Sequence, residues 1–417
     1  MILVDAAYTA LMRAITILGS TGSIGKNTLD VIRRNRDRYR VFALVAGQNV
    51  DELVSQILEF RPEVVVVATD EALSRLRQKL KDVGLPRPRW PQLAAGARAR
   101  VEAAVAAGVA FVMSAIVGVA GLEATHAAVH ESKTVGLANK ELLVASGELL
   151  MSAAREHNAE LIPVDSEHNG AHQCLRAGRP EEVSRLILTA SGGPFWNTDI
   201  AELQDVTPEQ ALKHPTWKMG KRISLDSATL MNKGFEVIEA CWLFGLQPSQ
   251  VEVVIHPQSI VHAMVEYSDG SVLAQMSAPD MRMPIQYALL YPDRKPSAVA
   301  PLRWDEFRKL EFYPPDHIKF PLLKLSYQAH ETGGSAPCTL NAADEVAVEA
   351  FLRGEISFPG IGEVVAETLD RVAVRRISSI GDVLEADELS RRVAREVVKI
   401  RGRNGVPSVL VAPAKAV

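Results

Sequence analysis

A glycine-rich turn between a buried strand and a helix is the feature that most constrains the fold of this chain. The turn Gly19–Gly25 (GSTGSIG) follows the apolar run Ala14–Leu18 and precedes a helical pattern of apolar residues. Short β-rich runs then alternate with helical patterns as far as Arg155. This alternation predicts a parallel sheet with helices on both faces. We therefore expect an α/β protein whose N-terminal domain is Rossmann-like.

Three further regions follow, each with its own pattern. From about residue 160 short strands continue, and the turn Asp269–Gly270 between two apolar runs predicts a β-hairpin. Prolines concentrate between residues 291 and 321, which is typical of a linker, and helical spacing of apolar residues follows from Leu322. We expect a disordered extension at 1–13, a nucleotide-binding domain at 14–158, a central α/β domain at 159–290, a linker at 291–321 and a C-terminal helical bundle at 322–417.

Composition and charge exclude several classes of protein. The chain has 417 residues, of which 47% are hydrophobic and 23% charged, and its net charge is -4. These values argue against a disordered chain and against a nucleic-acid-binding protein, which is normally strongly basic. The first residues lack a basic leader, no run approaches ~18 uncharged apolar residues, and the three cysteines are far apart. We expect a soluble, cytoplasmic protein that binds neither nucleic acid nor membrane.

The glycine-rich turn also indicates a nucleotide site. Glycines let the backbone approach a pyrophosphate, and the start of the following helix supplies free N–H groups for it. The spacing is GxxGxxG and not the GxGxxG typical of NAD sites, so a simple tight turn is the alternative. Gly47, Gln48 and Asn49 stand at the end of the second strand, where an NAD enzyme usually places an acid. Since no acid there would repel a 2′-phosphate, the sequence favours NADP over NAD.

Two separate groups of acids predict a divalent metal site. Asp165 and Glu167 follow an apolar run, and residues two apart in an extended chain face the same side. Glu236 lies one helical turn beyond Asn232 and offers a third carboxylate, with Glu239 behind it. Oxygen ligands without nearby cysteines suit Mg²⁺ or Mn²⁺. A helix N-cap with solvated acids and an ordinary amphipathic helix are the alternatives for the two groups.

Nearby polar side chains suit a phosphate, and one loop suits a lid. A hydroxyl, an amide and an ammonium at Ser227, Asn232 and Lys233 are together suited to a phosphate dianion. Ser191 begins another glycine-rich loop that offers backbone donors to an anion. The segment His214–Arg222 combines Pro, Trp, Met and Gly, which predicts a lid that closes over substrate. A surface loop whose tryptophan packs on the core is the alternative.

Together these residues resemble one family, the 1-deoxy-D-xylulose 5-phosphate reductoisomerases. The resemblance extends from about Arg13 to about Val406. It rests on Gly19–Gly25, Ala138–Glu141, Val164–Asn169, Ala190–Phe195, His214–Glu239, His256–His262 and Leu340–Glu345. It implies NADPH and Mg²⁺ or Mn²⁺ as cofactors, and reduction of a rearranged sugar phosphate in the methylerythritol phosphate route to isoprenoids. It also implies a homodimer, in which the central domain is catalytic, carries the dimer contacts and has a flap at 208–220.

The resemblance implies roles for individual residues. The metal ligands would be Asp165, Glu167 and Glu236, which form the catalytic set together with Lys140. The substrate would contact Lys140, Ser166, Glu167, Ser191, His214, Ser227, Asn232, Lys233 and Glu236. NADPH would contact Thr21, Gly22, Ser23, Ile24, Gly47, Gln48, Asn49, Asn139, Glu141 and Gly220. The flap would include His214, Trp217 and Met219.

One position departs from the family pattern, and two other functions compete with the one implied. Gln48 stands where a Lys or Arg is common, so we expect NADPH to be preferred over NADH by a smaller margin than in relatives with a cation. The first competing function is another NADP-dependent dehydrogenase, for example of an amino-acid semialdehyde. The second is a regulator that senses NADPH without turnover. Neither needs three carboxylates beside a phosphate pocket.

Overall fold

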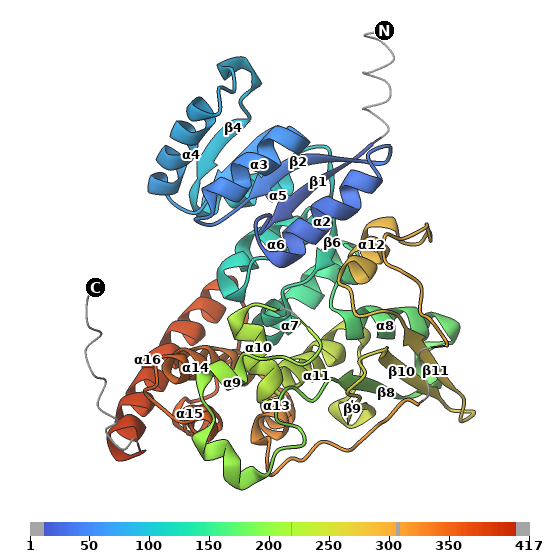
Figure 1. Ribbon diagram of the computed structural model, residues 1–417, viewed down its shortest axis with the longest axis vertical. Coiled ribbons are helices and arrows are strands. Elements are labelled where there is room, and N and C mark those ends of the chain that lie inside the picture. The colour runs from blue at the N-terminus through green and yellow to red at the C-terminus, as the bar shows by residue number, and fades with distance from the viewer. Residues whose placement is uncertain (1–11, 218, 306–308, 406–417) are drawn as a thin grey trace.

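The computed structural model describes residues 12–217, 219–305 and 309–405. Most of the extension expected at 1–13 and the chain from residue 406 onward lie outside the described residues, although Arg13 already belongs to a strand. Figure 1 shows a smaller lobe built from the first part of the chain and a larger lobe with the C-terminal helices. Among the described helices, none combines the length and the apolar character needed to span a bilayer.

Seven parallel strands form the sheet of the smaller lobe. They are β1 (Arg13–Leu18), β2 (Tyr39–Val45), β3 (Val64–Val67), β4 (Gln92–Ala95), β5 (Val109–Ser114), β6 (Thr134–Leu137) and β7 (Leu161–Pro163). Their spatial order is β4-β3-β2-β1-β5-β6-β7, so the direction of succession reverses between β1 and β5. Dinucleotides bind at such a reversal, outside the carboxyl ends of the strands. The parallel sheet expected from the sequence is confirmed.

The two edge strands of this sheet, β4 and β7, differ from what the sequence predicts. β4 is not among the strands predicted from the sequence, because Gln-Leu-Ala-Ala contains no β-branched or aromatic residue. β7 pairs with β6 from Val135 to Leu137, so the sheet continues past residue 158, where we expected the first domain to end. The first sheet therefore ends with β7, a few residues after the predicted domain boundary.

Helices cover both faces of the first sheet, as Figure 1 shows. They are α2 (Ser23–Arg34), α3 (Val50–Phe60), α4 (Asp70–Asp82), α5 (Gly96–Val105), α6 (Leu122–His130) and α7 (Lys140–Glu156). Successive residues of a strand point to opposite faces, and Ile17 and Leu18 accordingly belong to two separate cores. The later helix α12 (Arg282–Leu290) adds Ile285 and Leu289 to the core around Ile17. The Tyr39 hydroxyl donates to the Leu289 carbonyl over 2.6 Å.

A smaller mixed sheet lies in the larger lobe. It consists of β8 (Val183–Ala190), β9 (Val251–Ile255), β10 (Val261–Tyr267) and β11 (Val272–Met276), in the order β11-β10-β8-β9. The predicted hairpin joins β10 to β11, and Gly270 has a φ of +82°, which favours glycine. The helices α8 (Ser166–Cys174) and α11 (Met231–Phe244) pack with this sheet in a single apolar core.

The C-terminal helices share that core. They are α13 (Pro321–Thr332), α14 (Ala336–Leu352), α15 (Phe358–Arg371) and α16 (Ile380–Gly405). Phe351 and Phe358 belong to the same cluster of buried side chains as Val265 of the sheet. Gly234 of α11 approaches α13 so closely that a Cβ would lie 2.1 Å from the Ser326 hydroxyl. The fold class predicted from the sequence is confirmed, with a continuous core between its second and third regions.

Candidate functional site

Three chain segments that are far apart in sequence meet at one buried charged cluster. Lys140 begins α7 directly after β6, Asp165 follows β7, and Glu236 lies in the second turn of α11. The Lys140 ammonium lies 2.8 Å from Asp165 Oδ2, 3.0 Å from Glu236 Oε1 and 2.8 Å from the amide oxygen of Asn232. Since parallel strands end at the same edge of a sheet, β6 and β7 deliver the first two groups side by side.

Asp165, Glu167 and Glu236 form a set of three carboxylates that can hold a cation. One oxygen from each lies within 4.8 Å of the others. Burial, together with the charges of Glu236 and Asp165, raises the pKa of Glu167 to about 8 against the effect of Lys233. Burial also acts on Asp165, but Lys140 holds the pKa of that carboxyl well below its usual range. The structure thus brings together the three ligands that the sequence predicts.

The local geometry differs from the extended chain we expected at Asp165 and Glu167. Asp165 is the N-cap of α8, and its Oδ1 accepts from the Glu167 backbone N–H at 3.1 Å. Glu167 lies in the first helical turn, where its Oε2 accepts from the Ser166 hydroxyl at 2.6 Å. The N-cap alternative is therefore correct as local structure. The carboxylates nevertheless converge, because α11 brings Glu236 to the start of α8.

A buried histidine and acid lie beneath this cluster, and their pairing was missed in the sequence. His168 Nε2 lies 2.8 Å from the Glu236 carbonyl oxygen, and His168 Nδ1 lies 2.9 Å from Glu239 Oε2. Burial opposes charge on His168, but Glu239 raises the pKa of that imidazole to about 9. The only signal was that Glu239 lies one turn after Glu236 on the same face. No spacing in the sequence connects it with His168.

A second polar group contains Ser191, His214 and Ser227. His214 Nε2 lies 2.9 Å from Ser191 Oγ and 3.1 Å from Ser227 Oγ. His214 Nδ1 accepts from the backbone N–H groups of Thr216 and Trp217 at 3.1 and 2.9 Å. Because Nδ1 accepts, the proton of the neutral ring lies on Nε2. Burial lowers the pKa of His214, which favours this neutral form.

Asn232 and Lys233, which we expected beside these hydroxyls, lie instead against the carboxylates. The Asn232 amide donates to Glu236 Oε1 at 2.6 Å, and the Lys233 ammonium contacts the same Glu236 carboxylate and lies 3.6 Å from Glu167 Oε1. Both side chains start from α11, which follows Ser227 closely in the chain. Their side chains therefore belong to the carboxylate cluster, and not to the group of Ser191, His214 and Ser227.

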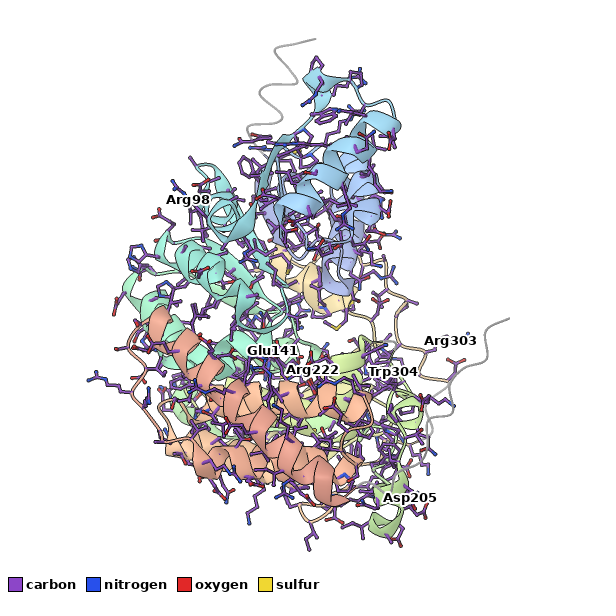
Figure 2. All side chains as sticks on the ribbon, turned by 90° about the vertical axis from the view of Figure 1, so that its left-hand side faces the viewer. Arg98, Glu141, Asp205, Arg222, Arg303 and Trp304 are labelled. Atoms are coloured by element: carbon purple, nitrogen blue, oxygen red, sulfur yellow. The ribbon has the colours of Figure 1, made fainter. Side chains whose placement is uncertain are left out.

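The expected flap begins with the short helix α9 (Pro208–Ala211) and ends at α10 (Lys221–Ala228). Trp217 and Met219 are partly buried, Gly220 is the N-cap of α10, and Lys218 lies outside the described residues. Arg222 anchors this end through Asp226 at 3.0 Å and Asp344 of α14 at 2.7 Å. Figure 2 shows Arg222 near Glu141, at the junction of the two lobes.

The predicted nucleotide loop connects β1 to α2. Gly19 has a φ of +90°, and a Cβ there would lie 2.4 Å from the Ala115 carbonyl oxygen after β5. A Cβ on Gly25 would lie 2.4 Å from the Gly19 and Ser20 carbonyl oxygens. Thr21, Gly22, Ser23 and Ile24 line the turn, and all four are at least partly exposed. The turn thus presents backbone at the β1/β5 reversal.

The remaining predicted NADPH residues surround the same edge of the sheet. Gly47 and Gln48 follow β2 and are exposed, and Asn49 caps α3 by accepting from the Glu52 N–H at 3.3 Å. The Asn139 amide donates to the Gly118 carbonyl at 2.8 Å and also contacts the Ile116 carbonyl. Asn139 therefore fixes the loop after β5, and Glu141 follows it in α7.

A cavity opens beside Ser166, between α8 and α12. Its lining includes His262, Ser277, Tyr287 and Arg294. His262 Nε2 lies 3.2 Å from the Ser277 carbonyl oxygen, and burial lowers the pKa of His262 to about 4. This imidazole is therefore neutral near pH 7.

Comparison with known proteins covers almost the entire chain. The family model of 1-deoxy-D-xylulose 5-phosphate reductoisomerase matches residues 15–147, and the model of its C-terminal domain matches residues 161–244. A further model, of the DXP reductoisomerase C-terminal domain, matches residues 276–393. The reductoisomerase of Solibacter usitatus is 64% identical over 395 residues, which is 95% of this chain and 100% of the relative. That of Cupriavidus metallidurans is 52% identical over 92% of this chain and 98% of the relative.

Solved structures give the same result. The Zymomonas mobilis reductoisomerase in complex with NADPH has a TM-score of 0.87 and 44% identity, over 93% of this chain and 99% of that one. A DOX-P reductoisomerase in complex with NADPH, fosmidomycin and magnesium has a TM-score of 0.86 and 40% identity, over 93% and 99% of the two chains. With its fold, its carboxylate cluster and these relatives, the chain belongs to the 1-deoxy-D-xylulose 5-phosphate reductoisomerase family.

Proposed function

We propose that this chain rearranges 1-deoxy-D-xylulose 5-phosphate and reduces the rearranged aldehyde with NADPH, giving 2-C-methyl-D-erythritol 4-phosphate. The observation that carries this function is the buried set Asp165, Glu167 and Glu236 at the carboxyl edge of a dinucleotide-binding sheet. A semialdehyde dehydrogenase or an NADPH-sensing regulator has no use for this set. The relatives named above are reductoisomerases of this substrate.

The donor set fits a hard divalent cation. All three ligands are carboxylates, and the described histidines and cysteines contribute none to the cluster. Such all-oxygen sites suit Mg²⁺ or Mn²⁺. When bound, the cation supplies Lewis-acid stabilisation for the negative charge that develops on substrate oxygens. The buried Lys140 and Lys233 already show that positive charge is stable beside these carboxylates.

Lys140 and Lys233 position the ligands and bind substrate. Burial opposes the charge of each ammonium, yet the surrounding carboxylates raise both pKa values, so both remain protonated. A protonated Lys140 donates to three oxygens at once and orients Asp165 and Glu236. An ammonium has three N–H donors, so Lys140 donates to a substrate hydroxyl or carbonyl in exchange for one of these contacts, without proton transfer. Ser166, beside Glu167, offers a further hydroxyl to the substrate.

Ser191, His214 and Ser227 hold the substrate phosphate, with Asn232 and Lys233 next to them. The Nε2 proton of His214 and the two hydroxyls offer three donors in one place, since Nε2 lies 2.9 and 3.1 Å from the two hydroxyl oxygens. His214 also accepts from the backbone of Thr216 and Trp217, so phosphate binding is linked to the position of the flap. A closed flap carrying Trp217 and Met219 excludes water from the reacting carbons.

The glycine cradle at β1 fits NADPH. The space that a Cβ would fill at Gly19 and Gly25 is occupied by neighbouring backbone, which brings the start of α2 close to the turn. This arrangement offers backbone N–H groups to the pyrophosphate, while Asn139 fixes the loop on the other side of the reversal. NADPH supplies the hydride that reduces the aldehyde.

Loss of NADPH absorbance on addition of 1-deoxy-D-xylulose 5-phosphate tests this function. We expect turnover that requires Mn²⁺ or Mg²⁺ and stops when a chelator is added. Fosmidomycin should inhibit, because a phosphonate hydroxamate can bind a metal and a phosphate pocket together. Turnover that is unaffected by the chelator would contradict the metal assignment, and no turnover with metal present would contradict the function.

We also propose a cytoplasmic homodimer formed through the mixed sheet. The strands β8, β9 and β10 contribute buried side chains to the core that they share with helices, whereas the edge strand β11 leaves Val272 and Leu273 exposed by 48% and 39%. Exposed apolar side chains on a sheet are typical of protein interfaces. Sedimentation of the purified protein tests this, and a monomer at all concentrations would contradict it.

A further inference from the structure

A cation from a distant part of the chain lies at the end of β2, where the local sequence contains none. Gln48 stands where the family pattern commonly has a Lys or Arg, and a neutral amide gives a 2′-phosphate no Coulomb attraction. In the fold, the guanidinium of Arg75 from α4 contacts the Gln48 side-chain oxygen. The Gln48 amide nitrogen in turn lies 3.4 Å from the Thr69 hydroxyl, at the N-cap of α4. Gln48 therefore lies between the end of β2 and the start of α4.

Arg75 differs from Lys79, a neighbouring cation of the same helix, in its partners. Lys79, one turn later on α4, forms an ion pair with Asp51 of α3, so its charge is already compensated. Arg75 forms no ion pair with a carboxylate anywhere in the described chain, and its hydrogen-bonding partner is the neutral Gln48. The pKa of Glu71 is lowered mainly by hydrogen bonds from the backbone and from Thr69, and the charge of Arg75 adds only a smaller effect. An exposed guanidinium that faces a neutral amide remains available to an anion.

The position of this cation matches one part of the cofactor. In a dinucleotide-binding sheet the adenosine ribose lies at the end of the second strand, where Gln48 and Asn49 stand here. The ribose 2′-phosphate of NADPH is a tetrahedral dianion, and a guanidinium binds two oxygens of such a group through two parallel hydrogen bonds. NADH lacks that phosphate and gains nothing from the cation.

We propose that Arg75 is a specificity-determining residue that binds the 2′-phosphate of NADPH, with Gln48 holding its guanidinium at the end of β2. This inference rests on the proposed use of NADPH and adds the residue that selects it over NADH. The cation at this site comes from the second helix after the strand, and not from the strand end itself. The NADPH preference that Gln48 alone would weaken is thereby restored.

Calorimetric titration of the full chain with NADPH, NADH, 2′,5′-ADP and 5′-AMP tests this inference, without substrate or metal. We expect Arg75→Gln to raise the Kd for NADPH and 2′,5′-ADP by about tenfold or more, the size of a lost charge-assisted hydrogen bond. The Kd values for NADH and 5′-AMP, which lack the 2′-phosphate, should change by less than about twofold. Arg77→Gln is the matched control, because Arg77 is exposed on the same helix.

Two further measurements separate charge from structure and this inference from the proposed function. Gln48→Lys in the Arg75→Gln background should restore tight binding of 2′,5′-ADP, because it places a cation at the strand end. Arg75→Gln could instead weaken NADPH and NADH equally, which would leave the ratio of their Kd values as in the wild type. That result, or no rescue by Gln48→Lys, would overturn the role of Arg75. Wild-type turnover of 1-deoxy-D-xylulose 5-phosphate remains in each of these cases, whereas its absence would contradict the proposed function alone.

Discussion

The nucleotide loop and the carboxylate cluster lie at the same edge of the first sheet but are built by different means. At Gly19 and Gly25 the loop depends on the absence of side chains, since a Cβ at either would lie 2.4 Å from a carbonyl oxygen. At Asp165, Glu167 and Glu236 the site depends on buried charges that are balanced by Lys140 and Lys233. The first site tolerates no added atoms, and the second tolerates no lost charge.

The largest effect should follow the loss of one charge from the cluster. Glu236→Gln keeps the shape of the side chain but removes a ligand and leaves Lys140 and Lys233 with less compensation. We expect turnover to fall by about a thousandfold, which is the range for losing a key electrostatic contribution in a dry site. Mn²⁺ affinity, followed by electron paramagnetic resonance, should fall with it. Unchanged Mn²⁺ affinity would show that Glu236 is not a ligand.

The buried pair beneath the cluster should matter for folding more than for ligands. His168→Gln removes the partner of Glu239 and leaves a buried acid uncompensated. Breaking a buried pair in this way costs about 3 kcal/mol of stability. Chemical denaturation monitored by circular dichroism measures the change. The double variant His168→Gln, Glu239→Gln should recover part of the loss, because no unpaired charge remains, and a loss that simply adds would contradict the pairing.

The nucleotide loop should respond to a single methyl group. Gly25→Ala places a Cβ 2.4 Å from two carbonyl oxygens in a helix whose backbone is otherwise compatible with alanine. We expect NADPH binding to weaken by a factor of about 30, or about 2 kcal/mol, because the turn must shift. Gly381→Ala at the start of α16 is the control, since a Cβ there would meet only the Ser379 hydroxyl, at an ordinary 3.5 Å. If both variants bound NADPH alike, the cradle would not depend on close approach.

Acid should act on the central region through His262. The burial that lowers the pKa of His262 to about 4 keeps it neutral in the fold, whereas the unfolded chain gains a proton near pH 6.5. Well above pH 6.5 His262 is neutral in both the folded and the unfolded chain, so it does not affect the free energy of unfolding. As the pH falls from 6.5 to 5.5 we expect it to cost about 1 kcal/mol. His262→Gln should remove this part of the acid sensitivity, and an unchanged pH dependence of unfolding would contradict it.

The sequence predicts the parts of each site that are local and misses those that depend on distant partners. Asp165 with Glu167, and Asn232 with Glu236, were found because their spacing places them together on one element. The contact of His168 with Glu239 joins two helices, and that of Arg75 with Gln48 joins a helix to a strand end. No local pattern contains such pairs. β4 was missed for a different reason, since pairing with β3 alone makes its small residues a strand.

The common core of the mixed sheet and the C-terminal helices has a consequence for how the molecule can be divided. Val265, Phe351 and Phe358 lie in one buried cluster although a long proline-rich segment separates the first from the others. That segment is itself fastened, because Tyr313 exchanges backbone hydrogen bonds with Ile255 at 2.8 and 2.9 Å. We therefore expect the helices from α13 onward to form one cooperative folding unit with the mixed sheet. A protease cut in the connecting segment would yield two fragments that stay together as one particle, and the C-terminal helices could not be exchanged between relatives like a removable module.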